Sequence, residues 1–297
     1  MNSSLNNLLL HPRTRDQAED FIKKPAHCLL IIGSHGSGKY ALAKALAATL
    51  LRLSPSKSLD SYPYFFHLLK EEGKQEIPID SIRLLITKLH LKTPGDANSV
   101  RRVIIIEGAH SLSSEAQNAL LKVLEEPSDD TIFLLTLPSA QVILPTITSR
   151  SQVLRLLPIS WLAARDYYSG TPAGEVKAAW QLSQGSMGLL IALLKNVKDH
   201  ELKQAIEEIK IFLSQNRYER LMQAESWGRN RVKLSMILEA LNRILVPLHH
   251  AALQRQETSR AIKLLEGRVL IRRMQKQLMS NISSRLLSLE LALKLRV

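Results

Sequence analysis

The sequence contains little cysteine, and this scarcity excludes two kinds of stabilising site. Cys28 is the single cysteine among 297 residues, so no disulfide framework can form within the chain. Tetrahedral zinc requires several Cys or His ligands at close spacing, whereas the nine histidines are scattered and have no cysteine partners. We therefore expect no zinc and no other metal centre.

Long apolar runs are also missing. No run approaches the roughly 18 residues that a membrane-spanning helix needs. The first seven residues carry no positive charge, although a secretory signal normally begins with one. We expect a cytoplasmic protein that has no membrane partner.

Near its beginning the chain does contain a glycine-rich loop, which follows an apolar run at residues 28–32. The loop reads Gly33-Ser34-His35-Gly36-Ser37-Gly38-Lys39-Tyr40. This spacing is typical of a phosphate-binding loop, in which backbone N–H groups cradle the phosphates and the lysine reaches the β and γ oxygens. Tyr40 stands where a small hydroxyl normally completes the Mg²⁺ shell, and its side chain is too long for that role.

The second half of a nucleotide site, a buried strand that ends in acidic residues, is incomplete as well. Residues 103–106, Val-Ile-Ile-Ile, suit a parallel strand that is buried on both faces. Glu107 follows, but Gly108 occupies the position of the general-base carboxylate. We expect a chain that does not hydrolyse ATP and requires no cofactor, while ATP binding stays open. The candidate nucleotide-site residues are Gly33, Gly36, Gly38, Lys39, Tyr40 and Glu107.

Two further segments resemble a known family. Residues 110–127, His-Ser-Leu-Ser-Ser-Glu-Ala-Gln-Asn-Ala-Leu-Leu-Lys-Val-Leu-Glu-Glu-Pro, are similar to the helix after the second nucleotide motif in AAA+ clamp-loader subunits. Residues 145–151, Pro-Thr-Ile-Thr-Ser-Arg-Ser, resemble the Ser-Arg-Cys motif of this family, with serine in place of cysteine. Within the family, the chain is most similar to the subunits of the bacterial DNA polymerase III clamp loader that have degenerate ATP sites and act as the stator of the motor.

The resemblance implies a catalytic role in trans for Arg150, next to Ser149. In the resembling complexes, this arginine projects into the ATP site of a neighbouring subunit and stabilises the charge that develops on the transferred phosphoryl group. The implied partners are the gamma/tau motor subunits and the delta subunit, with the sliding clamp and primed DNA reached through the complex. By itself, an isolated arginine would more simply cap a helix or pair with a carboxylate.

The chain departs from the hydrolysing members of this family in other places. Many clamp-loader subunits carry a four-cysteine zinc module after the first helix, but residues 47–70 contain no cysteine. In hydrolysing members, a Gly-Ser stretch of the lid precedes an arginine that senses the γ-phosphate, whereas Gly188 occupies this position here. The position of the first nucleotide sensor falls on Thr136 or Leu137. These departures favour a subunit that does not hydrolyse ATP.

Periodicity and chain breakers predict three domains, of α/β plus all-α class. Residues 1–157 combine amphipathic helices with strand-like runs and are expected to form an α/β domain around a parallel sheet, which the resemblance implies is an AAA+ RecA-like P-loop domain. Residues 158–205 are expected to form a small helical domain, which the resemblance implies is the lid. Residues 206–297, which contain few glycines or prolines, are expected to form an all-helical domain, and the resemblance implies that this domain is a collar that mediates oligomerisation. The strand-like runs are 28–32, 103–106, 131–136 and 152–156.

Positive charge is concentrated in the second half of the sequence. Residues 1–157 hold 18 Lys and Arg against 15 Asp and Glu, whereas residues 158–297 hold 22 against 12. Such a surplus of positive charge favours binding to DNA phosphates or to acidic partner subunits. Lysines and arginines on solvated helix faces would explain the surplus equally well. The basic cluster at 268–276 lacks the interleaved aromatic residues of a single-strand binding platform.

Two other functions remain open from the sequence. One is an active AAA+ ATPase, a motor subunit or helicase-like enzyme, that uses Lys39 and Glu107 in altered geometry, with Glu115, Glu125 or Glu126 as the base. These glutamates lie beyond the strand end, and a base must reach the attacking water. The other is a DNA-binding adaptor outside any motor, which would use the basic second half.

Restoring a threonine at position 40 is expected not to restore ATP hydrolysis, because Gly108 and Gly188 would still lack the base and the sensor. Phosphate release by purified Tyr40→Thr protein should equal that of the unmodified chain. The double variant Lys39→Ala/Tyr40→Thr controls for a contaminating ATPase. Turnover that the single variant shows and the double variant lacks would contradict the expectation.

Overall fold

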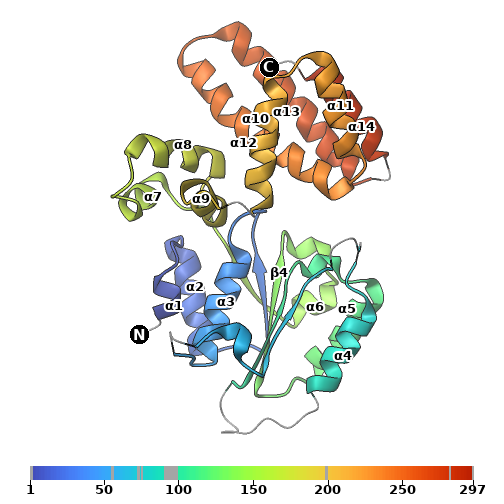
Figure 1. Cartoon of the computed structure of the whole chain (residues 1–297). Helices are drawn as coiled ribbons and strands as arrows, with labels where there is room; N and C mark the ends of the chain where they lie inside the picture. Colours follow the sequence, from blue (N-terminus) through green and yellow to red (C-terminus); the bar gives the residue numbers. More distant parts are fainter. Residues whose placement is uncertain are drawn as a thin grey trace. The chain divides into compact units, whose positions relative to one another are not determined.

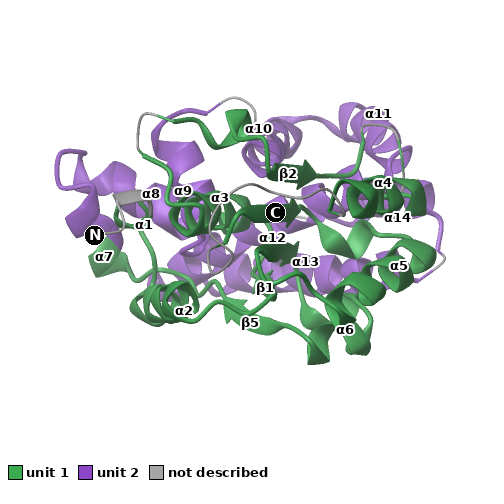
Figure 2. Cartoon of the chain, turned by 90° about the horizontal axis from the view of Figure 1, so that it is seen from below, with its two compact units in different colours: residues 1–163 green, residues 164–297 purple. Residues whose placement is uncertain are grey.

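A computed structural model describes residues 3–54, 57–71, 74, 76–89, 100–197, 200–280 and 282–295. The chain forms two compact units, Met1–Ala163 and Ala164–Val297, which Figure 2 shows in separate colours. Each unit has its own hydrophobic core.

The first unit is built on a five-stranded sheet in which every strand pairing is parallel. The strand order is β2-β3-β4-β1-β5. All residues of β1, β3 and β4 are buried, as expected for central strands that are covered on both faces. The strands are β1 Cys28–Ile32, β2 Phe65–Leu68, β3 Arg102–Ile106, β4 Thr131–Leu137 and β5 Gln152–Arg155.

The four strands that the sequence predicts lie within a residue or two of the predicted runs, and the predicted class, α/β around a parallel sheet followed by an all-α part, is confirmed. Strand β2 was not predicted. It lies at the edge of the sheet, and each of its residues is only half-buried. A short aromatic run on an edge strand lacks the continuous branched apolar pattern that identifies β3.

Helices cover both faces of this sheet. Figure 1 shows α1, α2 and α3 on one side and α4, α5 and α6 on the other. These helices are α1 Ser3–Asn6, α2 Pro12–Lys23, α3 Lys39–Leu50, α4 Ile79–Leu89, α5 Ser114–Glu125 and α6 Pro145–Ser149. Short 3₁₀ turns, η1 Leu59–Ser61, η2 Ala109–Ser111 and η3 Ala140–Val142, complete the connections.

A buried ion pair fixes the beginning of the two central strands β3 and β4. Arg102 Nη2 lies 3.2 Å from both carboxylate oxygens of Asp130, and Arg101 Nη2 lies 3.1 Å from Oδ2. Arg102 also donates to the carbonyl of Leu89 at the end of α4. These contacts satisfy charges that would otherwise be costly to bury, and they align the strands whose other ends carry the candidate site.

The second unit is helical. Its helices α8 to α14 contribute to one continuous core, whereas α7 begins before the boundary between the units. The central helix is the 24-residue α12, which packs against α10 and α13. The helices are α7 Trp161–Tyr167, α8 Ala173–Ser183, α9 Met187–Leu194, α10 Glu201–Ser214, α11 Arg217–Gly228, α12 Arg231–Gln254, α13 Thr258–Leu278 and α14 Ser284–Lys294.

Helix α10 spans residues 205 and 206, where the sequence places the boundary between lid and collar. Leu189 of α9 belongs to the same core as Leu202 of α10 and Leu241 of α12. Buried Arg243 of α12 donates to the carbonyl of Ser183, at a distance of 2.5 Å. The segments therefore share packing in this chain, and their division into separate lid and collar domains stays a prediction.

The close packing of α11 on α14 depends on Gly228. A Cβ atom at this position would lie 2.6 Å from the Cα of Arg285 and 2.5 Å from Ser288 Oγ. Gly228→Ala is therefore expected to lower the free energy of unfolding of the helical unit by about 1–3 kcal/mol. Denaturant unfolding followed by near-UV circular dichroism would measure the change.

Gly174→Ala is the matched control, because a Cβ atom on this residue of α8 meets nothing within 4 Å. Alanine favours helix more than glycine does, so this change should be neutral or stabilise by up to about 1 kcal/mol. Equal stability of the two variants would show that the α11–α14 contact is looser than described.

Candidate nucleotide loop and arginine site

The glycine-rich loop connects β1 to α3 and has the backbone of a phosphate-binding loop. Gly36 and Gly38 adopt positive φ angles of 74° and 90°, which glycine reaches without steric cost. Gly33 packs closely against Ser37, whose Oγ would lie 2.6 Å from an added Cβ atom. The loop thus leads directly into the N-terminus of a 12-residue helix, where an anion would be favoured.

Lys39 bonds back to its own loop. Its Nζ donates to the carbonyl oxygens of Gly33, at 2.9 Å, and Ser34, at 2.8 Å. Burial lowers the pKa of this ammonium group to about 8, and the nearby Glu107 carboxylate partly opposes that shift. The lysine charge is therefore held by two carbonyl dipoles in a poorly solvated place.

Tyr40 is bound to Glu107 through one histidine. The rings of Tyr40 and His67 stack with centroids 4.6 Å apart, and the tyrosine hydroxyl lies 3.2 Å from His67 Nδ1. His67 Nε2 lies 3.1 Å from Glu107 Oε2. Burial raises the pKa of the Tyr40 phenol. Three elements, α3, β2 and the end of β3, meet in this chain of contacts.

This donor set does not fit a magnesium nucleotide site. Magnesium requires near-ideal octahedral oxygen ligation, usually from a hydroxyl or carboxylate together with phosphates and water. The Tyr40 hydroxyl and the Glu107 carboxylate are both engaged with His67. In the described part of the chain, no group of three or more His, Cys, Asp or Glu residues could hold a metal ion.

Gly108, the residue after Glu107, forms the turn that follows β3. Gly108 has a φ of 64°, and its N–H donates to Thr136 Oγ1 over 2.9 Å. Thr136 is buried, as is Leu137 beside it. The threonine considered as a first nucleotide sensor therefore stabilises the turn after β3.

Arg150 lies at the C-terminal end of α6 and is exposed. Its Nη2 lies 3.0 Å from Glu125 Oε1, and its Nη1 donates to the Thr146 carbonyl over 3.1 Å. Ser149 Oγ donates to the same carbonyl, also over 3.1 Å. The simpler alternative from the sequence, pairing of the arginine with a carboxylate, thus describes its contacts within this chain.

Helix α5 positions this arginine. The side chain of Gln117 accepts a hydrogen bond from the N–H of Leu144, the residue that precedes α6, over 3.0 Å. The same side chain donates to the Leu112 carbonyl. Glu125, considered as an alternative base, lies at the last turn of α5 and binds Arg150. The sequence run at 110–127 therefore supports the arginine segment.

The structure brings Lys39, Tyr40 and Glu107 together at the loop, and places Ser149 and Arg150 in a separate group of contacts. Reasoning from the sequence missed the part that His67 plays. The available signal was a histidine in a Tyr/Phe-rich run, which becomes informative only when that run is recognised as a strand beside β3.

The buried amine of Lys39 is expected to titrate near pH 8, so it is mostly charged at pH 7 and mostly neutral above about pH 9. NMR of ¹³Cε-labelled lysine would show one signal with that midpoint, absent in Lys39→Met. Glu107→Gln should lower the midpoint further, because the carboxylate stabilises the ammonium. A midpoint above about 10, the ordinary value for lysine, would contradict this description.

Along the part of the chain that the structure describes, no helix is both long and apolar enough to span a bilayer.

A solved structure of a DNA polymerase III gamma subunit-related protein from Thermotoga maritima has the same general fold, with a TM-score of 0.54 and 15% identity. That match covers 96% of this chain and all of the other.

The family model described as DNA polymerase III, delta subunit, matches residues 17–160. The DNA polymerase III subunit delta' of Pseudomonas aeruginosa is 32% identical over 233 residues, covering 72% of this chain and 69% of the relative. For the Escherichia coli subunit delta', the match is 31% over 190 residues, covering 57% and 54%. By sequence and fold, the chain belongs to the delta' subunit family of DNA polymerase III.

Proposed function

We propose that this chain is a stator subunit of the DNA polymerase III clamp loader, which does not hydrolyse ATP and supplies Arg150 in trans to a neighbouring ATPase subunit. The observation that carries the proposal is the contrast between its two sites. At the nucleotide loop, Lys39 binds a loop carbonyl, and His67 binds both Tyr40 and Glu107. Arg150, in contrast, is exposed at the end of a helix.

The engagement of Tyr40 and Glu107 supports the absence of hydrolysis. Hydrolysis needs a magnesium ligand at the loop and a base that reaches the attacking water. Neither Gly108 nor the Tyr40 hydroxyl, which contacts His67, is suited to these tasks. A chain of this kind requires no cofactor and no zinc, and ATP retained on Lys39 would be a structural ligand.

The contacts of Arg150 are weak enough to be exchanged on assembly. Its ion pair with Glu125 is exposed on both sides, with 39% and 52% of the side chains accessible. Such pairs contribute about 0–1 kcal/mol. The same guanidinium opposite a phosphoryl group in a water-excluded site stabilises the transition state far more, by about 10³–10⁵ in rate in other nucleotide hydrolases.

The partners follow from this role. We propose a cytoplasmic hetero-oligomer with the gamma/tau motor subunits and the delta subunit, which acts on the sliding clamp and primed DNA. Membership of the delta' family supports this assembly. A likeness to the replication factor C small subunit of Methanococcus maripaludis, 29% identical over 189 residues, supports it too.

Replacing Arg150 is expected to abolish the contribution of this chain to ATP turnover. A clamp loader reconstituted from motor and delta subunits, with clamp and primed DNA, would be assayed without this chain, with it, and with Arg150→Ala. Turnover at the site that Arg150 serves should fall by about 10³-fold or more. Arg150→Lys should recover little, because lysine lacks the planar fork of donors.

Arg165→Ala is the matched control, since Arg165 is also exposed and paired with a carboxylate, that of Asp166. It should leave the stimulation unchanged. Size-exclusion chromatography would confirm that the Arg150→Ala chain still assembles. Equal stimulation by the Arg150→Ala chain would make the arginine structural, and turnover by the isolated chain that Lys39→Ala abolishes would make the protein an ATPase itself.

A further inference from the structure

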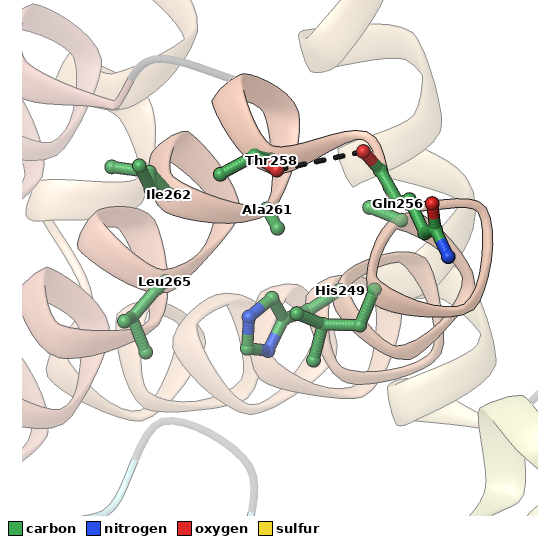
Figure 3. Close-up of a pocket in the computed structure, with 8 residues that line it drawn as sticks. His249, Gln256, Thr258, Ala261, Ile262 and Leu265 are labelled. Carbon is green, nitrogen blue, oxygen red and sulfur yellow. Dashed lines mark hydrogen bonds between the residues drawn. The ribbon is translucent and has the colours of Figure 1, made fainter.

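The helical unit carries an apolar pocket of about 470 Å³ where the end of α12 meets the start of α13. Figure 3 shows side chains of both helices around the same space, with His249 on one side and Ile262 and Leu265 on the other. Gln256 and Thr258 lie at the connection between the helices. The lining residues are His249, Ala252, Leu253, Gln256, Thr258, Ala261, Ile262 and Leu265.

An exposed apolar row extends the pocket along α13. Ile262, Leu265 and Val269 are 53%, 47% and 60% exposed. Their spacing of three and four residues places them on one face of the helix. The core of the unit is made by a different row of α13, which includes Ala261, Leu264, Ile271, Met274 and Leu278. The exposed row is therefore not needed to pack α13 against the core of its own unit.

The same row turns basic toward the end of α13. Arg272 and Lys276 continue the spacing after Val269, and both are exposed. Helix α13 holds six Arg or Lys residues against one Glu. Among the ion pairs formed between described residues, none includes Arg272 or Lys276. An apolar surface is thus followed by uncompensated positive charge over about 14 residues, or roughly 21 Å of helix.

His249, which lines the pocket, can act as a hydrogen-bond donor to an occupant. Arg268 Nη1 lies 2.7 Å from His249 Nδ1, and burial together with the Arg268 charge lowers the pKa of the His249 imidazole. A neutral His249 that accepts at Nδ1 carries its proton on Nε2. That N–H can donate to a carbonyl or carboxylate oxygen of an occupant that enters between the helices.

We propose that this groove, formed by the end of α12 and the exposed row of α13, binds an amphipathic helix of a partner protein, with apolar residues at heptad spacing followed by Asp or Glu residues. Helix-in-groove recognition uses anchors at such spacing, and the acidic residues complement Arg272 and Lys276. The proposal goes beyond the role of Arg150 and does not depend on it.

Two other occupants fit less well. DNA would use the basic residues, but its phosphates gain nothing from Ile262, Leu265 and Val269, because the phosphate backbone is bound through charge. A second copy of α13 would place Arg272 and Lys276 against like charge in a parallel pair. In an antiparallel pair, the same residues would face the apolar half of the row.

The groove can be tested in the full-length chain by photo-crosslinking. A benzoylphenylalanine replacing Ile262 in cells, followed by mass spectrometry, should give a cross-link to a protein segment of the stated pattern. The control carries the same group at Ile211 of α10, which is 58% exposed and lies outside the row. No cross-link above this control, or a cross-link to nucleic acid or to a second copy of the chain, overturns the proposal.

Binding of the cross-linked segment, synthesised as a labelled peptide, would then be measured by fluorescence anisotropy with the purified chain. Leu265→Asp should weaken binding at least tenfold, and Arg272→Glu at least fivefold, with a smaller salt dependence. Met222→Asp on α11, at a residue that is 55% exposed, should change nothing. A peptide with its carboxylates replaced by amides should bind as weakly to the unmodified chain as the original does to Arg272→Glu; equal binding would overturn the proposal.

Discussion

The parallel direction of the sheet is the constraint on which the nucleotide loop depends. Because β1, β2, β3 and β4 run the same way, their carboxyl ends meet at one edge. This places the loop after β1 near Glu107 after β3, and brings His67 of β2 and Thr136 of β4 to the same end. The central strands consist mainly of apolar residues that are buried on both faces of the sheet, and the polar groups of the site lie at the ends of the strands.

Polar contacts at the carboxyl ends of the strands determine which side chains are available to bind a ligand. In a typical phosphate-binding loop, the glycine-rich backbone and the lysine bind phosphates, and a small hydroxyl and a carboxylate bind magnesium. Here the carbonyls of the loop bind Lys39, and His67 binds both Tyr40 and Glu107. Arg150 differs, because its contacts lie at an exposed helix end and involve one surface carboxylate, that of Glu125, and the carbonyl of Thr146. The same domain thus has one site whose groups are mutually satisfied and one whose guanidinium is accessible.

Much of the first unit could be predicted from sequence, for physical reasons. Runs such as Val103-Ile104-Ile105-Ile106 are short, apolar and branched, which favours buried central strands, and the glycine spacing identifies the loop. Strand β2 could not be predicted, since a half-buried edge strand carries no clear period. The link through His67 was missed for the same reason, because it exists only when β2 lies beside β3. The shared core of α9, α10 and α12 brings together residues that are distant in sequence, such as Leu189, Leu202 and Leu241, and periodicity does not reveal this.

The chain of contacts from Tyr40 through His67 to Glu107 has a historical consequence. A site that loses catalysis by one substitution can regain it by reversing that substitution, provided that nothing else has come to rely on the change. Here the tyrosine ring is stacked on His67, and His67 in turn holds the carboxylate. A small hydroxyl residue at position 40 would remove this ring packing. Position 40 therefore cannot change without also affecting the packing of His67 and the place of the Glu107 carboxylate.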